Sequence, residues 1–395
     1  MTPLVLSAAG LVTALGRGQA ATLAALRARR DGLRRCDFAG LGHGYIGRVA
    51  DVEAHMLPPD LAGFDCRNNR LADMALRSDG FTAAVARAVA RYGADRIAVV
   101  VGTSTSGVLS CEEAYLRRDR QTGRLPDELD YSRTHDLQSL AWFVRAALGL
   151  AGPALTVSTA CASSARAILD ASHLIASGIA DAAVAGGADS LCRLTLAGFA
   201  ALDLVSPEPC RPCDAGRQGI SVGEAAGFCL LEGSTTAQGS GGIALLGAGA
   251  SSDGYHMSSP RPDGAGAALA MRRALDSAGL APGDIDAINL HGTGTKANDA
   301  AEDAAVAAVF GDAVPASSTK GFTGHTMGSC GIVEAIIGCL SLEHGLLPGC
   351  LRVERVDPAF RAQVATRNED RPLRRLISNS FGFGGTNVSL VLGQL

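Results

Sequence analysis

The sequence is almost free of lysine. Lys296 and Lys320 are the only lysines among 35 basic residues, and 39 acidic residues leave a net charge of -4. Because the chain has no cationic excess, it offers no general electrostatic attraction for nucleic acid or for an anionic membrane surface. In a chain that otherwise uses arginine, each lysine is expected where a compact ammonium group is needed.

A long hydrophobic run is also absent. Asp170 and Asp181 interrupt the most apolar stretch before it reaches the roughly 18 to 20 residues that span a bilayer. Residues 1–15 are apolar, but they lack a basic leader and are broken by Pro3 and Gly10, which is typical of a first strand and turn rather than of a secretion signal. We therefore expect neither a membrane-spanning nor a secreted protein.

The cysteines form no disulfide framework. They number 11 and have no recurring spacing, which favours a reducing compartment and predicts a cytoplasmic location. Cys210 and Cys213 form a single C-x-x-C pair, which is poor evidence for zinc without a second pair, so no metal site is predicted. A chain of 395 residues that is 47% hydrophobic can bury one large core or two fused cores without such cross-links.

Short β-branched runs alternate with longer alanine-rich segments along the chain. A predicted helix over 80–91, for example, precedes a predicted strand over 96–101. This alternation is typical of the α/β class. Because no glycine/serine or proline tract stands out as a flexible linker, we expect a compact body.

A weak internal repeat divides the chain. Residues 154–164 and 315–325 each contain an extended run with a Ser-Thr pair and a tight turn of small residues. In both cases an apolar helix follows, predicted over residues 165–177 and 331–342. Two similar halves, each of a size typical of a domain, are the simplest account. We place them at residues 1–238 and 239–395.

Cys161 is a candidate nucleophile. Residues 156–160 are predicted to form a buried strand, and a helix is predicted to follow, so the thiol lies at a helix N-terminus. Free N–H groups and the helix dipole favour a thiolate there and can stabilise an oxyanion. A lone cysteine is more often a buried structural residue, so catalysis requires a base and partners.

Two histidines supply candidate partners. His291 directly follows a predicted strand over 287–290, and His325 lies in a similar strand-to-helix turn. The ends of strands are where α/β proteins assemble sites. Glu334 lies in an apolar helix, where a carboxylate is costly unless paired, and Lys320 or water is its expected partner.

The loop after His291 has the sequence G-T-G-T. It lacks the third glycine of a dinucleotide site, so nicotinamide binding is rejected. Asp299 and Glu302 fit an N-cap and capping box that open the next helix.

The last segment, residues 375–392, predicts a strand, a glycine-rich turn and a returning strand. Phe381 and Phe383 lie between glycines, and a flexible turn packs aromatic rings poorly. We expect them to form a hinged hydrophobic gate whose backbone N–H is available to a ligand.

Four motifs, in order along nearly the whole chain, resemble those of elongating β-ketoacyl-[acyl-carrier-protein] synthases in the thiolase superfamily. They are S-T-A-Cys161-A-S-S, His291-G-T-G-T, Lys320-G-F-T-G-His325 and the glycine-rich segment 379–387. The resemblance implies a thiolase-like α/β fold of five αβαβα layers, with two pseudo-symmetric halves and usually a dimer. The family that the chain resembles includes enzymes of type II fatty acid, polyketide and aryl polyene synthesis.

The resemblance also implies the reaction. An acyl group on Cys161 condenses with malonyl-acyl-carrier-protein, releasing 3-oxoacyl-acyl-carrier-protein and carbon dioxide. His291 and His325 would stabilise the enolate, and the backbone N–H groups of Cys161 and Phe383 would hold the oxyanion. The substrates are carried on phosphopantetheine, so acyl carrier protein is the implied partner and no metal or redox cofactor is implied.

Supporting roles follow from the same resemblance. Lys320 would orient and polarise the region of His325, and Glu334 would fix the loop geometry. The remaining implied residues are Thr293 and Thr295 for the pantetheine arm, Thr105 and Ser106 for the inner end of the acyl pocket, and Cys213, which takes the place of an aromatic residue of the family.

Several alternatives stay open. A polar 102–107 loop and an insertion over 116–131 are similar to synthases of specialised polyene or polyketide clusters. The chain could be one subunit of a ketosynthase and chain-length-factor heterodimer; the non-catalytic subunit normally lacks the cysteine, so Cys161 indicates the active half. A coenzyme-A-dependent thiolase would use a different residue set, which makes His325 the discriminating residue. A Cys-His hydrolase would pass the acyl group to water.

Overall fold

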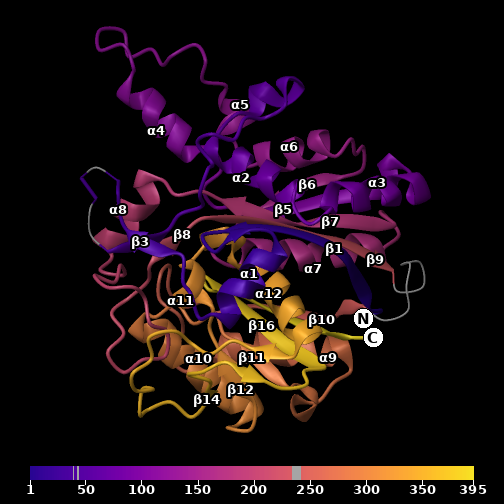
Figure 1. Ribbon diagram of the computed structural model, residues 1–395, viewed down its shortest axis with the longest axis vertical. Coiled ribbons are helices and arrows are strands. Elements are labelled where there is room, and N and C mark those ends of the chain that lie inside the picture. The colour runs from indigo at the N-terminus through magenta and orange to yellow at the C-terminus, as the bar shows by residue number, and fades with distance from the viewer. Residues whose placement is uncertain (39, 42–43, 234–241) are drawn as a thin grey trace.

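A mixed β-sheet runs through the whole molecule (Figure 1). The structure, a computed structural model, describes residues 1–38, 40–41, 44–233 and 242–395. The strand order is β14-β12-β11-β16-β17-β10-β1-β9-β7-β5-β6, with β2 paired to β1. The strands of this sheet are β1 (Leu4–Thr13), β2 (Gly16–Arg17), β5 (Ile97–Gly102), β6 (Ala154–Val157), β7 (Ala182–Asp189), β9 (Ala225–Gly233), β10 (Ile243–Ser252), β11 (Ala287–Asn289), β12 (Pro315–Ser317), β14 (Gln363–Val364), β16 (Arg375–Gly382) and β17 (Thr386–Gln394).

The strand order repeats itself about the centre of the sheet. In the first half, β1, β9, β7, β5 and β6 follow one another outward, and β10, β17, β16, β11 and β12 do the same in the second half. In both halves the inner pairs are antiparallel and the outer pairs are parallel. The two halves join where β1 pairs with β10. The predicted pseudo-symmetric halves are therefore confirmed, while the boundary proposed between residues 238 and 239 lies outside the described residues.

Helices cover the outer faces of the two halves of the sheet, and two further helices pack between the halves (Figure 1). α7 (Ser163–Ala176) and α12 (Cys330–His344) pack on each other between the two halves. A Cβ atom on Gly331 would lie 2.6 Å from the backbone nitrogen of Ala165, so this close packing requires glycine. Together with the outer helices, these layers form the predicted five-layer αβαβα fold. The outer helices are α2 (Arg67–Leu76), α3 (Phe81–Tyr92) and α6 (Ser139–Ala147) on one side and α9 (Ala265–Ala278) and α10 (Lys296–Phe310) on the other.

Shorter elements lie around this frame. The helices are α1 (Gln19–Arg27), α4 (Val108–Leu116), α5 (Tyr131–Thr134), α8 (Arg193–Ala201) and α11 (Lys320–Thr323). Short strands form two small sheets, β3 (Leu33–Arg35) with β4 (Tyr45–Gly47) and β8 (Val222–Gly223), and β13 (Leu346–Leu347) with β15 (Glu369–Asp370). The segment between α4 and α5 projects from the body at the top of Figure 1, where the sequence predicted an insertion.

The strand before Cys161 differs from its prediction. β6 ends at Val157 and lies at the edge of the sheet, where the side chain of Leu155 is 46% exposed. The sequence predicted a buried strand over residues 156–160, but a strand at the end of the order has one neighbour only. Across the residues that the structure describes, no helix is both long and apolar enough to cross a membrane.

Candidate active site

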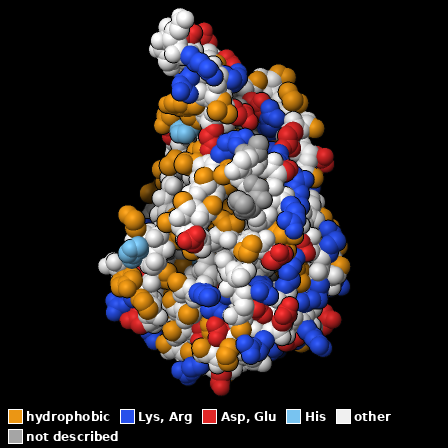
Figure 2. Space-filling view, turned by 90° about the vertical axis from the view of Figure 1, so that its left-hand side faces the viewer, with side chains coloured by type: hydrophobic (Ala, Val, Ile, Leu, Met, Phe, Trp, Pro, Cys, Tyr) orange, Lys and Arg blue, Asp and Glu red, His pale blue; other side chains and the backbone are white. Residues whose placement is uncertain are grey.

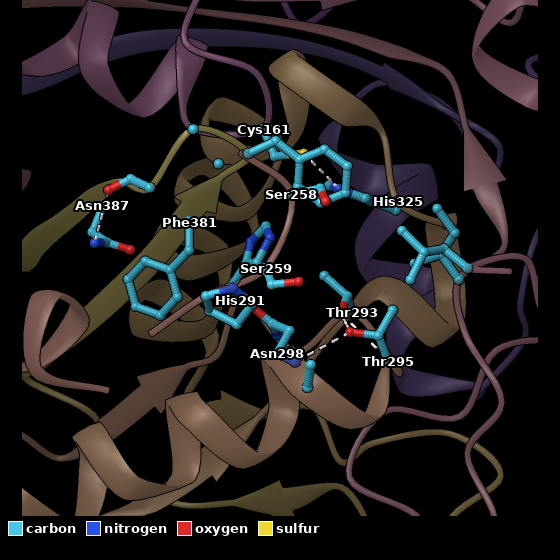
Figure 3. A pocket seen from close by; sticks show the side chains of 18 of the residues that line it. Cys161, Ser258, Ser259, His291, Thr293, Thr295, Asn298, His325, Phe381 and Asn387 are labelled. Carbon is cyan, nitrogen blue, oxygen red and sulfur yellow. Dashed lines mark hydrogen bonds between the residues drawn. The ribbon is translucent and has the colours of Figure 1, made fainter. Parts of the chain in front are cut away.

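Cys161 lies between β6 and the start of α7, with only 6% of its surface exposed. Its Sγ atom is 2.9 Å from Nε2 of His325 (Figure 3). The preceding residue, Ala160, has a left-handed φ of 50°, which turns the chain sharply before the helix. Burial raises the pKa of the Cys161 thiol to about 12, although the positive charge of Lys320 opposes the rise. The resting thiol is therefore protonated and needs a base.

His291 and His325 face this thiol from the second half of the chain. His291 follows β11, and its ring meets the ring of His325 edge to face with centroids 5.3 Å apart. The backbone of His325 donates to Ser221 and accepts from Gly223. Burial, together with the charge of Lys320, lowers the pKa of both histidines well below 6.5, so both imidazoles are neutral at pH 7.

Lys320 and Glu334 form a buried ion pair, as the sequence predicted. The ammonium also donates to the backbone oxygen of His291 and lies 3.3 Å from its Nδ1. Because an ammonium can only donate, Nδ1 accepts and the ring proton of His291 is on Nε2. Burial raises the pKa of Glu334 to about 7 against the opposing charge of Lys320. Burial alone would lower the pKa of Lys320, but the Glu334 carboxylate raises it.

The contact of Lys320 differs from its prediction. The resemblance placed the lysine in the region of His325, but its side chain reaches His291. The short helix α11 separates Lys320 from His325 and directs the ammonium toward the end of β11. His291 is the histidine whose tautomer this lysine determines.

Asp299 and Glu302 do not form a capping box, so that prediction was wrong. The cap of α10 is Thr295, whose hydroxyl accepts from the N–H of Asn298. Glu302 instead accepts the N–H groups of His291 and Gly292, at 2.8 Å each, and Asp299 accepts from Gly294. Burial raises the pKa of Glu302 to about 7. Both acids face inward because their helix packs directly behind the glycine loop that carries His291.

Cys161, His291 and His325 line one pocket, whose volume is about 100 Å³ (Figure 3). Thr293 and Thr295, predicted for the pantetheine arm, line its wall, and their hydroxyl oxygens are 3.0 Å apart. The sequence prediction missed polar residues on the same walls, namely Ser258, Ser259, Asn298 and Asp253. Asp253, Ser258 and Ser259 lie in the loop between β10 and α9, and Asn298 lies in the first turn of α10; their sequence carries no motif of its own.

Phe381 and Phe383 line the same pocket. Phe381 is in β16, 5.7 Å from the ring of His291, and the partly exposed ring of Phe383 packs against Phe199 at 5.9 Å. A Cβ atom on Gly382 would lie 3.3 Å from the backbone nitrogen of Cys161. The end of β16 therefore runs directly against the backbone of Cys161.

Thr105 and Ser106 do not line this pocket. The hydroxyl of Thr105 donates to Asp189, and that of Ser106 donates to the backbone oxygens of Thr134 and Asp136. Their role in an acyl pocket remains a prediction.

The three reactive side chains could also ligate a metal. One ligand atom from each of Cys161, His291 and His325 lies within 4.8 Å of the other two, and sulfur with two imidazoles suits zinc. The C-x-x-C pair offers no such site: Cys210 donates to the backbone oxygen of Lys320, and Cys213 is buried in a hydrophobic cluster. A thiol beside a neutral imidazole, with a second imidazole in reach, supports acyl transfer to sulfur.

Two family descriptions together match most of the chain. Residues 2–237 match "Beta-ketoacyl synthase, N-terminal domain", and residues 243–354 match "Beta-ketoacyl synthase, C-terminal domain".

Individual relatives agree with these matches. The chain is 41% identical over 265 residues to "3-oxoacyl-[acyl-carrier-protein] synthase, mitochondrial" of Arabidopsis thaliana, a match that covers 62% of this chain and 58% of that enzyme. It is 39% identical over 310 residues to "3-oxoacyl-[acyl-carrier-protein] synthase 2" of Rhizobium meliloti, covering 74% of this chain and 73% of that enzyme. Among solved structures, the ketosynthase ApeO in complex with its chain length factor ApeC from Xenorhabdus doucetiae has a TM-score of 0.88 at 38% identity, covering 99% and 98% of the two chains.

Proposed function

Because the chain belongs to the β-ketoacyl synthase family, we propose that it catalyses the decarboxylative condensation of a Cys161-bound acyl group with malonyl-acyl-carrier-protein. The observation that carries the proposal is the convergence of Cys161, His325 and His291 in one pocket. Thiolases and priming synthases use other residue sets, so the second histidine favours the elongating class.

In the first half-reaction, the thiol proton passes toward Nε2 of His325, which is in hydrogen-bond reach. The sulfur attacks the carbonyl of an acyl-carrier-protein thioester, and the pantetheine sulfur leaves with a proton. The backbone N–H groups of Cys161 and Phe383 would hold the oxyanion, since β16 runs against the Cys161 backbone. The thiol with its pKa near 12 becomes nucleophilic only with this base beside it.

In the second half-reaction, malonyl-acyl-carrier-protein enters along the wall of Thr293 and Thr295. The bond to the carboxylate breaks, carbon dioxide leaves, and the electron pair forms an enolate. The Nε2–H of His291 would hydrogen-bond the enolate oxygen, and His325 would supply the second contact in the tautomer that carries its ring proton on Nε2. The enolate carbon attacks the acyl-Cys161 carbonyl, and the thiolate leaves and is reprotonated.

A dimer is the proposed assembly. Apolar side chains are exposed on α5, on the turn between α5 and α6, on α6 and on the edge strand β6. They belong to Tyr131, Leu137, Trp142 and Leu155, and we call this surface the edge-strand surface. Figure 2 views a different side, which bears α4 and α8, where hydrophobic side chains gather below the projecting segment. Because an unpaired strand edge invites pairing with another chain, the edge-strand surface is the proposed subunit interface, and the resemblance makes a ketosynthase-like subunit the proposed partner.

The relatives support a particular kind of partner subunit. Two solved structures similar to this chain, at 38% and 32% identity, are of a ketosynthase with a chain length factor. We therefore favour a heterodimer in which this chain is the catalytic half, in a polyene or polyketide pathway, over a homodimer in fatty acid synthesis. All 11 cysteines are free, which favours the reducing cytoplasm.

A hydrolase is the alternative function. It would need water beside the acyl-Cys161 carbonyl, and Phe381 and Phe383 line the pocket that contains Cys161. The hydrophobic gate proposed for these two rings would exclude that water, which favours the condensing enzyme.

The test is intact-mass spectrometry of the purified protein, alone and with a chain-length-factor-type subunit. It is incubated with acyl carrier proteins of varied chain length and then with malonyl carrier protein, with Cys161→Ala as control. We expect acylation at Cys161 followed by a 3-oxoacyl product. Acylation that ends in free acid would indicate the hydrolase, and no acylation in either assembly would refute the proposal.

A further inference from the structure

A buried carboxylate, Asp189, lies among the segments that carry the reactive residues. It is the last residue of β7, it is fully buried, and the sequence prediction gave it no role. Six hydrogen bonds from four residues end on its two oxygens. The donors are the hydroxyl of Thr103, the N–H and hydroxyl of Ser104, the N–H and hydroxyl of Thr105, and the N–H of Gly328.

The donors come from two loops in different halves of the chain. Oδ1 accepts four of the bonds, all from Thr103, Ser104 and Thr105, at 2.7 to 2.8 Å. Oδ2 accepts the Ser104 hydroxyl at 2.6 Å and also the N–H of Gly328. One carboxylate oxygen therefore joins the loop after β5 to the turn after His325.

The turn that contains Gly328 packs tightly against its neighbours. A Cβ atom on Gly328 would lie 2.7 Å from Oδ2 of Asp189 and 3.2 Å from the backbone oxygen of Ala160. Met327 has a left-handed φ of 52°, so this turn is strained and needs external contacts to persist. On its other side, His325 is fixed by the backbone of Ser221 and Gly223. Asp189 thus anchors the turn after His325, and this turn lies close to the backbone of Ala160, the residue before Cys161.

We propose that Asp189 is a positioning residue that holds His325 against Cys161 and links both to the loop of residues 103–106. The proposal rests on the proposed function, in which this loop is expected at the inner end of the acyl pocket. An acyl chain that displaces the loop would change the bond from Ser104 to Oδ2 and, through the shared oxygen, the turn of Gly328. The decarboxylation step would then respond to the length of the bound acyl chain.

The test separates the two half-reactions in Asp189→Asn. Acylation of Cys161 is followed by intact mass, and carbon dioxide release from malonyl carrier protein is followed with the acylated enzyme, using short and long acyl chains. Because Nδ2 of asparagine cannot accept from Gly328, and because His325 serves both steps in the proposed function, we expect acylation and carbon dioxide release each to fall roughly 10- to 100-fold. The dependence of carbon dioxide release on chain length should also disappear.

Asp303→Asn is the matched control. Asp303 is a buried carboxylate that accepts the N–H groups of Arg361 and Ala362 and lies away from the pocket. We expect it to lower the melting temperature without changing the rate of either step. If Asp189→Asn slows neither step, or slows them no more than Asp303→Asn does, the proposal is wrong.

Ser104→Ala is a milder variant for the case that Asp189→Asn does not fold. It keeps the Asp189 charge and removes one donor from Oδ2, so it should abolish the dependence on chain length. The rate of Cys161 alkylation by iodoacetamide against pH requires no carrier protein. A displaced His325 would no longer stabilise the thiolate, so the midpoint of this profile should rise in Ser104→Ala. If the wild type makes no 3-oxoacyl product, the proposed function is wrong. An unchanged alkylation profile in Ser104→Ala would show independently that Asp189 does not position His325.

Discussion

At the scale of single residues, the site depends on one cation. Lys320 donates to His291 and Glu334 from a fully buried position, and through Nδ1 it places the proton of His291 on Nε2. One side chain thus sets the tautomer of an imidazole and compensates a buried carboxylate. The compact ammonium expected for a lysine in this arginine-rich chain fits that position.

We predict that Lys320→Gln lowers carbon dioxide release from malonyl carrier protein about 100-fold, because His291 loses the donor that fixes its tautomer. Stability should fall as well, because Glu334 is left buried without its cation. The double variant Lys320→Gln with Glu334→Gln is the control. Thermal melting should recover in the double variant while the rate does not; recovery of both would contradict a role in the reaction.

Glu302 gives a pH-dependent prediction. Its pKa rises from 4.5 unfolded to about 7 folded, so between these values the folded state holds a proton that the unfolded state has lost. Stability from this group is therefore present at low pH and lost as pH rises toward 7. In Glu302→Gln, denaturant unfolding should show less loss with rising pH than the wild type, by up to about 1.4 kcal/mol per pH unit. Parallel curves for the two proteins between pH 5 and 7 would contradict it.

The sequence predicted the reactive residues but not their supports. Cys161 and His291 each lie in the turn of a short contiguous pattern of strand, turn and helix, which can be recognised locally. Asp189 also ends an apolar strand, but its bonds reach Thr103 and Gly328, which are 86 and 139 residues away. Glu302 accepts hydrogen bonds from backbone N–H groups, and the sequence does not show which backbone groups lie near a side chain. Residues that act on distant backbone can be assigned only once the fold is known.

At the scale of elements, the contact between the end of β16 and the turn before α7 determines where the oxyanion can bind. A Cβ atom on Gly382 would lie 2.5 Å from the backbone oxygen of Thr159. The sequence predicted the strand and the glycine-rich turn, but not that β16 would lie against Cys161. That contact follows from the order of strands in the sheet, which local patterns do not encode.

We predict that Gly382→Ala slows acylation of Cys161 about 100-fold, because β16 must shift away from the nucleophile. Gly198→Ala is the matched control. Gly198 lies in α8 with no atom within 4 Å of an added Cβ, so the exchange should leave the rate unchanged and stabilise the helix slightly. Rapid-quench measurement of acyl transfer compares the two variants. Equal rates would show that the end of β16 does not position the oxyanion.

At the scale of the whole molecule, assembly and catalysis share one strand. β6 carries the edge-strand surface and leads within four residues to Cys161. The sequence predicted a dimer by resemblance and placed this strand in the core. In the proposed dimer the partner subunit would cover the exposed edge, which would account for both.

We predict that Leu155→Lys weakens subunit association, since a charge at a buried apolar contact is costly. Leu269→Lys is the control, because Leu269 is similarly exposed at 40% but lies on α9 in the other half. Sedimentation velocity across a range of concentrations should show dissociation of the first variant only. A stable dimer of Leu155→Lys would place the interface elsewhere.

The position of β17 has a consequence for how the protein is made. This strand, residues 386–394, lies inside the sheet between β16 and β10, and β10 pairs in turn with β1 near the start of the chain. A nascent chain on the ribosome therefore cannot complete this sheet until β17 has been released, and the edges of β10 and β16 stay open until then. Such late, non-local pairing is slow and exposed to aggregation, so yield in cells should depend on chaperones more than the stability of the finished enzyme suggests.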